Sequence, residues 1–151
     1  MSNITAVMVR DLRAQTGAGM MACKKALVET QGDLEEAVVL LRKQGEAKAE
    51  KRSSRVAAEG KIVTAVSDNA KQAIMIEVNC ETDFVARDNN FITFCDELAE
   101  KGLAERAVTV DSLLALANDQ GETVEQQRKA LVSQIGENIN VRRVVFIESD
   151  C

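Results

Sequence analysis

The residues best suited to chemistry or to a specific contact lie in the stretch Glu77–Asp88, which reads Glu-Val-Asn-Cys-Glu-Thr-Asp-Phe-Val-Ala-Arg-Asp. Its turn, Thr82–Val85, puts the aromatic Phe84 beside Asp83 between an expected strand and an expected helix, where loops commonly carry function. Three interpretations fit. Phe84 could pack onto the core of the following helix, Asp83 could merely cap that helix, or Phe84 could be an interface anchor ringed by polar groups. The spacing alone does not decide among these three interpretations.

A second unusual segment is Leu12–Met21, in which Gly17-Ala18-Gly19 precedes two adjacent methionines, Met20 and Met21. A Gly-x-Gly beside a helix start can bind phosphate, but this one follows no strand and lacks the lysine-serine ending of a P-loop. Two adjacent side chains at a helix start cannot both face one core, so we expect one methionine to be partly exposed for an adaptable protein contact. The alternative is that both pack within the helices.

The absence of histidine argues against most enzyme chemistry. Histidine is the usual general base near neutral pH and the usual partner of a nucleophilic serine or cysteine. An enzyme would have to use Lys24-Lys25 or the pair Asp83 and Asp88. The four cysteines form no Cys-x-x-Cys pair, so we expect reduced, mostly buried thiols rather than a zinc site. We therefore expect no enzyme, no metal and no cofactor.

The composition is that of a soluble globular protein, with 46% hydrophobic and 28% charged residues in 151. No apolar run approaches the roughly 20 residues that cross a bilayer, and the first residues do not form a secretory signal. We therefore expect a cytoplasmic protein without a membrane partner.

A basic segment, Arg42–Arg55, stands out against a net charge of −5. Such a patch could contact phosphates, which makes a nucleic-acid-binding adaptor the alternative function. However, the chain has no Trp or Tyr and only four Phe, so it is poor in the stacking platforms that single strands need. A solvated linker helix is the favoured interpretation.

Apolar spacing and capping residues predict the elements that position these segments. Residues 1–45 should form a bundle of three short helices: one capped by Thr5, one from about Gly19 to Thr30, and one that Asp33 begins and Gly45 ends. Residues 46–57 should form an exposed basic linker helix. This bundle has little core of its own.

From residue 58 onward the pattern changes to strands. Residues 62–66 and 73–79 should form a hairpin around a turn at 67–71, and the nearly continuous apolar second strand implies burial on both faces. Helices are expected over 90–101, over 110–118 and from Thr123 to Gly136, followed by a strand over 139–147. The predicted fold class is therefore α+β, a three-helix bundle followed by a small antiparallel sheet packed with helices.

Both unusual segments, together with Lys129-Ala130-Leu131 and Ile135–Arg143, resemble signature stretches of the bacterial translation elongation factor Ts family. The similarity runs without a gap from about Ile4 to Ile147, and eleven matching residues from Glu77 to Arg87 make it specific. The resemblance implies a guanine nucleotide exchange factor for the GTPase elongation factor Tu, with no direct contact to nucleic acid and no small-molecule substrate.

The resemblance also implies roles for particular regions. A ubiquitin-associated-like bundle (1–45) would dock on the GTPase, residues 46–57 would link it, and 58–151 would be the first core subdomain, with a turn that displaces the partner's Mg²⁺. The residues implied to contact the GTPase are Arg13, Met20, Met21 and Ile135, and those of the displacing turn are Thr82, Asp83, Phe84 and Val85.

The chain departs from the family pattern in one respect. Family members continue with a second core subdomain that grips another domain of elongation factor Tu, whereas this sequence stops at Cys151. We expect a fragment with weakened affinity for the GTPase.

Overall fold

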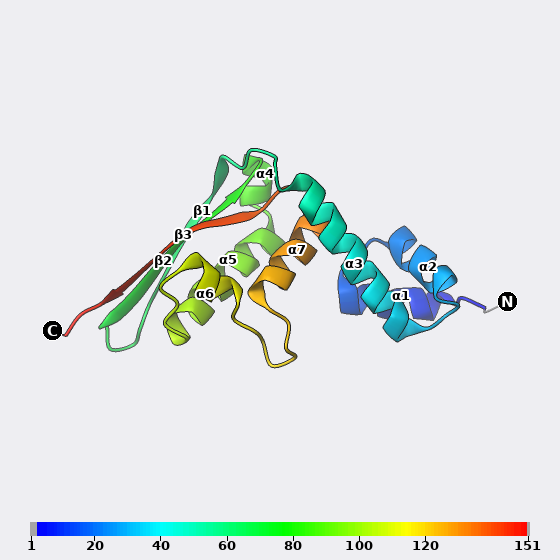
Figure 1. The fold of residues 1–151 in the computed structure, drawn as a ribbon, viewed down its shortest axis with the longest axis horizontal. Helices are drawn as coiled ribbons and strands as arrows, with labels where there is room; N and C mark the ends of the chain where they lie inside the picture. The colour runs from blue at the N-terminus through cyan, green and yellow to red at the C-terminus, as the bar shows by residue number, and fades with distance from the viewer. Residues whose placement is uncertain (1–2, 151) are drawn as a thin grey trace.

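The computed structural model describes residues 3–150, which form the α+β fold expected from the sequence. The molecule is elongated, with a helical bundle at one end and a sheet with its helices at the other (Figure 1). In chain order the elements are α1 (Ala6–Thr16), α2 (Met20–Glu29), α3 (Leu34–Arg52), β1 (Glu59–Val66), β2 (Gln72–Cys80), α4 (Asp83–Ala86), α5 (Asn89–Ala104), α6 (Val110–Leu114), α7 (Val124–Ile135) and β3 (Asn140–Glu148).

Local sequence explains where the bundle helices begin and end. Thr5 Oγ1 accepts a hydrogen bond from the Met8 N–H at 3.3 Å, and Asp33 Oδ1 accepts one from the Glu36 N–H at 2.9 Å. Gly17 ends α1 with a φ of 66°, a conformation that glycine adopts without a Cβ clash. The predicted three-helix bundle is confirmed, and its small core consists of Leu12, Cys23, Ala26, Leu27, Ala37 and Leu41.

The predicted end of the third helix at Gly45 is wrong, because α3 continues to Arg52. Glycine costs about 1 kcal/mol relative to alanine in a helix interior, but α7 packs beside α3 at this point, with Ser133 3.5 Å from where a Cβ on Gly45 would lie. Ala49, one turn later, is only 4% exposed and belongs to the main core beneath the sheet. Residues 46–57 therefore do not form a separate solvated helix, and the division of the chain into domains stays a prediction.

The sheet has the order β1-β2-β3, with antiparallel pairing throughout. The predicted hairpin is present, and the C-terminal strand pairs with the free edge of β2 as expected. Helices α5, α6 and α7 lie along one side of the sheet (Figure 1). The largest fully buried side chains of this main core include Ile74, Ile76, Val78, Phe91, Leu113, Val124, Val132 and Ile139.

The helices of this region largely follow the prediction. α7 begins with a capping box, in which Thr123 Oγ1 accepts from the Gln126 N–H and Gln126 Oε1 accepts from the Thr123 N–H. Gly136 ends α7 with a φ of 86°. The helix predicted over 110–118 is shorter than expected and ends at Leu114, because the chain then pairs as an isolated bridge between Ala117 and Thr123.

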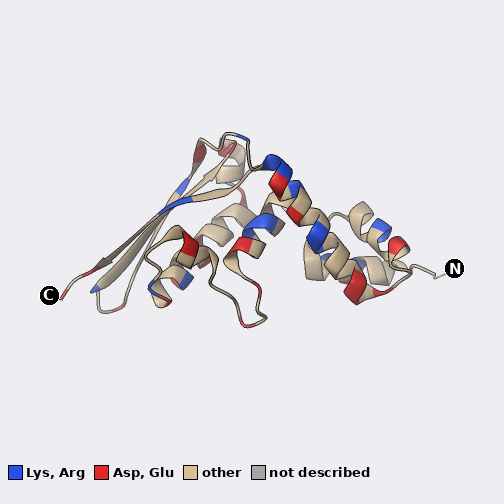
Figure 2. Ribbon diagram, viewed as in Figure 1, with Lys and Arg blue, Asp and Glu red and all other residues tan. Residues whose placement is uncertain are grey.

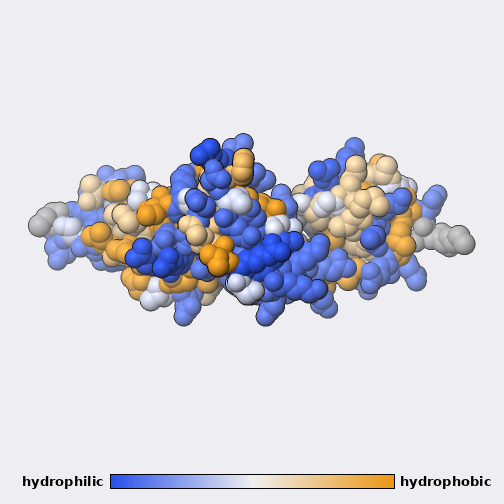
Figure 3. All heavy atoms as spheres, turned by 90° about the horizontal axis from the view of Figure 1, so that it is seen from above, coloured by the Kyte–Doolittle hydropathy of each residue, from blue (hydrophilic) through white to orange (hydrophobic). Residues whose placement is uncertain are grey.

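The prediction that β2 is buried on both faces is wrong. Ile74, Ile76 and Val78 point into the core and are at most 1% exposed, whereas Met75 between them is 46% exposed. Helices cover one face only, as an antiparallel sheet permits. Strand pairing places other exposed apolar residues on the face of Met75, namely Ile62, Val66, Val145 and Ile147. Figure 3 shows hydrophobic residues at the surface of both the sheet end and the bundle end.

Candidate protein-interaction site

The turn between β2 and α5 folds into α4, a helix of a single turn. Thr82 begins it, because Thr82 Oγ1 accepts a hydrogen bond from the Val85 N–H at 3.4 Å. Asp88 begins α5 in the same way and accepts from the Asn90 N–H at 2.9 Å. The two caps leave room for only one helical turn between them, so a short, exposed element follows directly from their spacing.

Phe84 lies on the outer side of α4 and is 82% exposed, whereas Phe91 in the next helix is fully buried. The interpretation that Phe84 packs into the core is therefore wrong. Asp83 is not a helix cap either, since Thr82 begins α4 and Asp88 begins α5. The Asp83 carboxylate lies 3.7 Å from the Arg87 guanidinium in an exposed ion pair. An exposed aromatic side chain next to charged groups has the character of an interface anchor without its partner.

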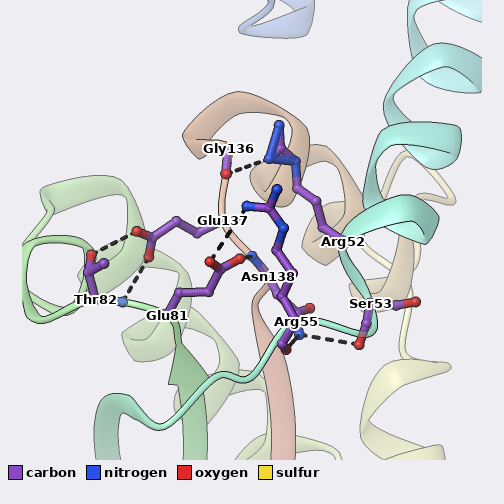
Figure 4. Close-up of polar contacts among 8 residues, drawn as sticks. All are labelled: Arg52, Ser53, Arg55, Glu81, Thr82, Gly136, Glu137 and Asn138. Atoms are coloured by element: carbon purple, nitrogen blue, oxygen red, sulfur yellow. Dashed lines mark hydrogen bonds and ion pairs between the residues drawn. The ribbon is translucent and has the colours of Figure 1, made fainter.

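The other two residues of the turn face inward. Val85 is half-buried against the main core. The Thr82 N–H and Oγ1–H both donate to the carboxylate of Glu137, with donor–acceptor distances of 3.1 and 2.7 Å (Figure 4). Burial, and then the nearby Glu137 charge, raise the pKa of the Cys80 thiol to about 11. Cys80 therefore keeps its proton near neutral pH, and its Sγ–H donates to Thr82 O at 3.2 Å.

A short segment between α7 and β3, Gly136–Asn138, joins this turn to the end of α3 (Figure 4). Arg52 Nη1 donates to the first carbonyl of the segment at 2.6 Å, and the Asn138 N–H donates to Glu81 Oε1 at 2.7 Å. Asn138 Nδ2 donates to Arg55 O at 2.8 Å. The Arg55 guanidinium lies 3.7 Å from the Glu81 carboxylate. Hydrogen bonds thus connect three segments that are distant in sequence.

Sequence reasoning assigned no role to Glu81, Glu137 or Asn138. Glu137 lies 55 residues from its partner Thr82, so no helical or strand period could bring the two together. Asn138 is only 6% exposed, and a buried amide of this kind must satisfy its hydrogen bonds within the fold. Only the tertiary structure, which brings the segment after α7 beside both Thr82 and the end of α3, reveals these contacts.

The other predicted contact residues lie elsewhere. Met20 and Met21 are 58% and 67% exposed in the first turn of α2, so the alternative that both pack within the bundle is wrong. Arg13 is exposed at the end of α1 and lines a groove of about 580 Å³ between the bundle and α7. Ile135, the last residue of α7, is half-buried against the main core. Figure 1 places α2 beside one half of α3 and α4 beyond its other end.

The alternative enzyme residues do not form a recognisable constellation. Lys24 and Lys25 are exposed on α2, while Asp83 and Asp88 are each engaged by a different partner, an arginine and a helix N-terminus. Among residues 3–150, no cluster of three or more cysteine, aspartate or glutamate side chains is arranged to hold a metal ion. In the same part of the chain, no helix is long and apolar enough to cross a membrane.

The cysteines agree with the prediction where the structure describes them. Cys23, Cys80 and Cys95 are buried, with free thiols. Burial raises the pKa of Cys95 to about 12, which keeps this thiol protonated and unreactive. The fourth, Cys151, lies outside the described residues.

The basic segment 42–55 runs along the second half of α3 and just beyond it (Figure 2). Two of its cationic side chains, Arg52 and Arg55, are engaged by the protein itself through a carbonyl and a carboxylate. Ala49 faces the main core. Fewer cations are therefore free to bind phosphates than the sequence suggested, which weakens the nucleic-acid interpretation.

The comparisons with known proteins agree on one family. The model of the family "Elongation factor TS" matches residues 81–151. The chain is 55% identical over 152 residues to the elongation factor Ts of Coxiella burnetii, which covers 99% of this chain and 51% of that protein. It is 57% identical over 147 residues to that of Methylococcus capsulatus, covering 97% and 50%, and 51% identical over 150 residues to that of Arthrospira platensis, covering 99% and 61%. The chain spans about half the length of the first two relatives.

Proposed function

Because the chain belongs to the elongation factor Ts family of translation elongation factors, we propose that it is a guanine nucleotide exchange factor for elongation factor Tu. The observation that carries the proposal is Phe84, an aromatic side chain that is 82% exposed. It lies on a turn whose first residue, Thr82, donates two hydrogen bonds to the Glu137 carboxylate. An apolar group presented in this way suits a pocket on a protein partner. The proposed role in protein synthesis places the protein in the cytoplasm.

Exchange of this kind requires no covalent step. A GTPase holds its nucleotide through Mg²⁺ and the backbone amides of the P-loop. A partner that binds the nucleotide-free form more tightly must weaken nucleotide binding by the same factor. In this proposal Phe84 enters an apolar pocket near the Mg²⁺ site of the GTPase, and Asp83 shifts the elements that hold Mg²⁺ and phosphate. The metal belongs to the GTPase, and this chain is not an enzyme.

The bundle provides the second contact. Met20 and Met21 offer exposed, flexible apolar side chains of the type that adapts to a partner surface. Arg13 adds a positive charge at the groove that Gly19, the residue before Met20, also lines. Ile135, at the end of α7, adds to the contact that α4 makes with the GTPase in this proposal. Since α3 joins the bundle to the core as one continuous helix, the two contacts can act together, and binding of one raises the effective concentration of the other.

The release of fluorescent GDP from purified elongation factor Tu tests the proposal. We expect the chain to accelerate release, and Phe84→Ala to slow that accelerated release about thirtyfold, which corresponds to a loss of about 2 kcal/mol for an interface anchor. Val66→Ala, which shortens another exposed apolar side chain on the open face of the sheet, is the matched control and should have no effect.

Two results would contradict this proposal. If the wild-type chain leaves the rate of GDP release unchanged, the exchange function is wrong for this chain. If Phe84→Ala unfolds the protein, Phe84 is a structural residue and the site assignment fails. The exposed position predicts instead a change in unfolding free energy within about 0.5 kcal/mol.

A further inference from the structure

The helix α4 is too short to hold its own shape. It has four residues, and ordering a first helical turn costs more conformational entropy than its hydrogen bonds offset. None of these four residues is fully buried, so packing supplies only part of the restraint. The direction in which Asp83 and Phe84 point must therefore be set by groups outside the helix.

Thr82 is one such group, because each of its polar atoms is hydrogen-bonded. In addition to the two bonds to Glu137, its Oγ1 accepts from the Val85 N–H at 3.4 Å and its carbonyl accepts from the Ala86 N–H at 3.2 Å. A hydroxyl has a single hydrogen, and when it is donated to a carboxylate the lone pairs remain available for a backbone N–H. The Glu137 carboxylate therefore orients the helix cap as well as the backbone before it.

Glu137 is itself held by its chain neighbours. It follows Gly136, whose positive φ ends α7, and precedes the buried Asn138. Arg52 binds the carbonyl on one side of it and Glu81 binds the N–H on the other (Figure 4). The carboxylate is thus presented to Thr82 from a backbone that is fixed at both ends.

We propose that Glu137 is a positioning residue, which holds α4 in the orientation that directs Phe84 and Asp83 at the GTPase. The inference rests on the proposed function, because the orientation affects activity only if α4 enters the partner. Hydrogen bonds to a charged acceptor are shorter and stronger than neutral ones, which suits an element that has little core of its own.

The first experiment requires no GTPase. Amide hydrogen exchange, followed by NMR, compares the wild-type chain with Glu137→Gln and Thr82→Val, which weaken the same contact from opposite sides. A single amide oxygen cannot replace two carboxylate oxygens, so we expect the Val85 and Ala86 amides to exchange about tenfold faster in Glu137→Gln. In Thr82→Val the Val85 N–H also loses its own Oγ1 acceptor, so the Ala86 amide, which binds the Thr82 carbonyl, is the readout in that variant. Glu77→Gln is the matched control, since Glu77 also binds through its carboxylate, to Arg143 at 2.8 Å on the sheet, and should leave these amides unchanged.

The second experiment measures GDP release from elongation factor Tu at a saturating concentration of each variant. We expect Glu137→Gln and Thr82→Val to slow the stimulated release about tenfold, and Glu77→Gln to have no effect. In a chain that already carries Phe84→Ala, Glu137→Gln should add less than about a twofold change, because the principal side chain that it positions is gone.

Either of two results would overturn the inference. The first is that the α4 amides of Glu137→Gln stay as protected as those of the wild-type chain. The second is that the fold-reductions in GDP release caused by Glu137→Gln and by Phe84→Ala multiply in the double variant, as independent effects would. A wild-type chain that does not accelerate GDP release would overturn the proposed function instead, and amide exchange would still decide whether Glu137 orients α4.

Discussion

The two regions proposed to contact the GTPase, the first turn of α2 and the turn α4, both expose apolar side chains on backbones that are held in different ways. α2 begins at Gly19 without a side-chain cap, and it is held because its other face is buried in the bundle core. α4 buries none of its residues fully: Val85 and Ala86 pack only partly against the main core, and the hydrogen bonds between Thr82 and Glu137 hold the residue that caps it. A helix of several turns can bury one face and bind with another, whereas a single turn needs polar groups from other segments.

The side chains match this difference in support. Met20 and Met21 are flexible thioethers, which adapt to the shape of a surface. Phe84 is a rigid ring, whose contact depends on the direction from which it approaches. The bundle is therefore suited to a contact that accepts some variation in the partner surface, whereas α4 is suited to a contact with one defined geometry.

The largest expected effect tests whether α2 depends on its buried face. Leu27→Ala should lower the free energy of unfolding by about 2–5 kcal/mol, because it leaves a cavity in the small bundle core. Amide exchange combined with urea denaturation should show that the bundle loses protection while β2 retains it, since the two cores are separate clusters. Val28→Ala, at an exposed position on the same helix, is the control. Loss of protection in both regions together would show that the bundle does not behave as an independent support for α2.

A smaller effect is expected on the α4 side. Asn138→Ala removes the hydrogen bond to Arg55 O at 2.8 Å from a buried position and should cost about 1–3 kcal/mol. The free energy of unfolding from urea denaturation measures this cost, and amide exchange should show faster opening around Val85 but not in α2. Asn90→Ala, at an exposed position at the start of α5, provides the comparison. If the α2 amides open as much as those of α4, the two supports are not distinct.

The smallest expected effect is on the pH dependence of stability, and it comes from an ion pair in α7 that also binds the chain just before β3. Arg128 donates to both carboxylate oxygens of Glu125, at 2.8 and 2.6 Å, and holds the pKa of Glu125 below its ordinary value of 4.5. Arg128 Nη1 also donates to Ile139 O at 2.8 Å, next to the segment that carries Glu137. Because the folded-state pKa is lowered, this stabilisation is present above the ordinary value and is lost as the pH falls through the lowered one.

Urea denaturation between about pH 6 and pH 3 measures this loss of stability, which should be on the order of 1 kcal/mol or less. Glu125→Gln should lack this part of the pH dependence, because its side chain does not titrate. An identical decline in the wild-type chain and in Glu125→Gln would show that the Glu125–Arg128 pair does not contribute to the acid sensitivity of the fold.

Local sequence signals predicted the helix ends that depend on the side chain or the backbone conformation of a single residue. Thr5, Asp33 and Thr123 cap helices because their side-chain oxygens bind a nearby N–H, and Gly17 and Gly136 end helices because they adopt a positive φ. Gly45 misled the prediction. It has the same residue type as a helix terminator, but α7 packs against it and the helix continues.

The sequence by itself therefore determined the order of the elements, the α+β class and the place of the Thr82–Val85 turn between a strand and a helix, because these depend on neighbours in the chain. Only the tertiary structure decided that Phe84 faces solvent, that one face of β2 is open, and that Glu137 binds Thr82. Each of these is a contact, or a missing contact, between segments many residues apart, and the energy of such packing leaves no local pattern in the sequence.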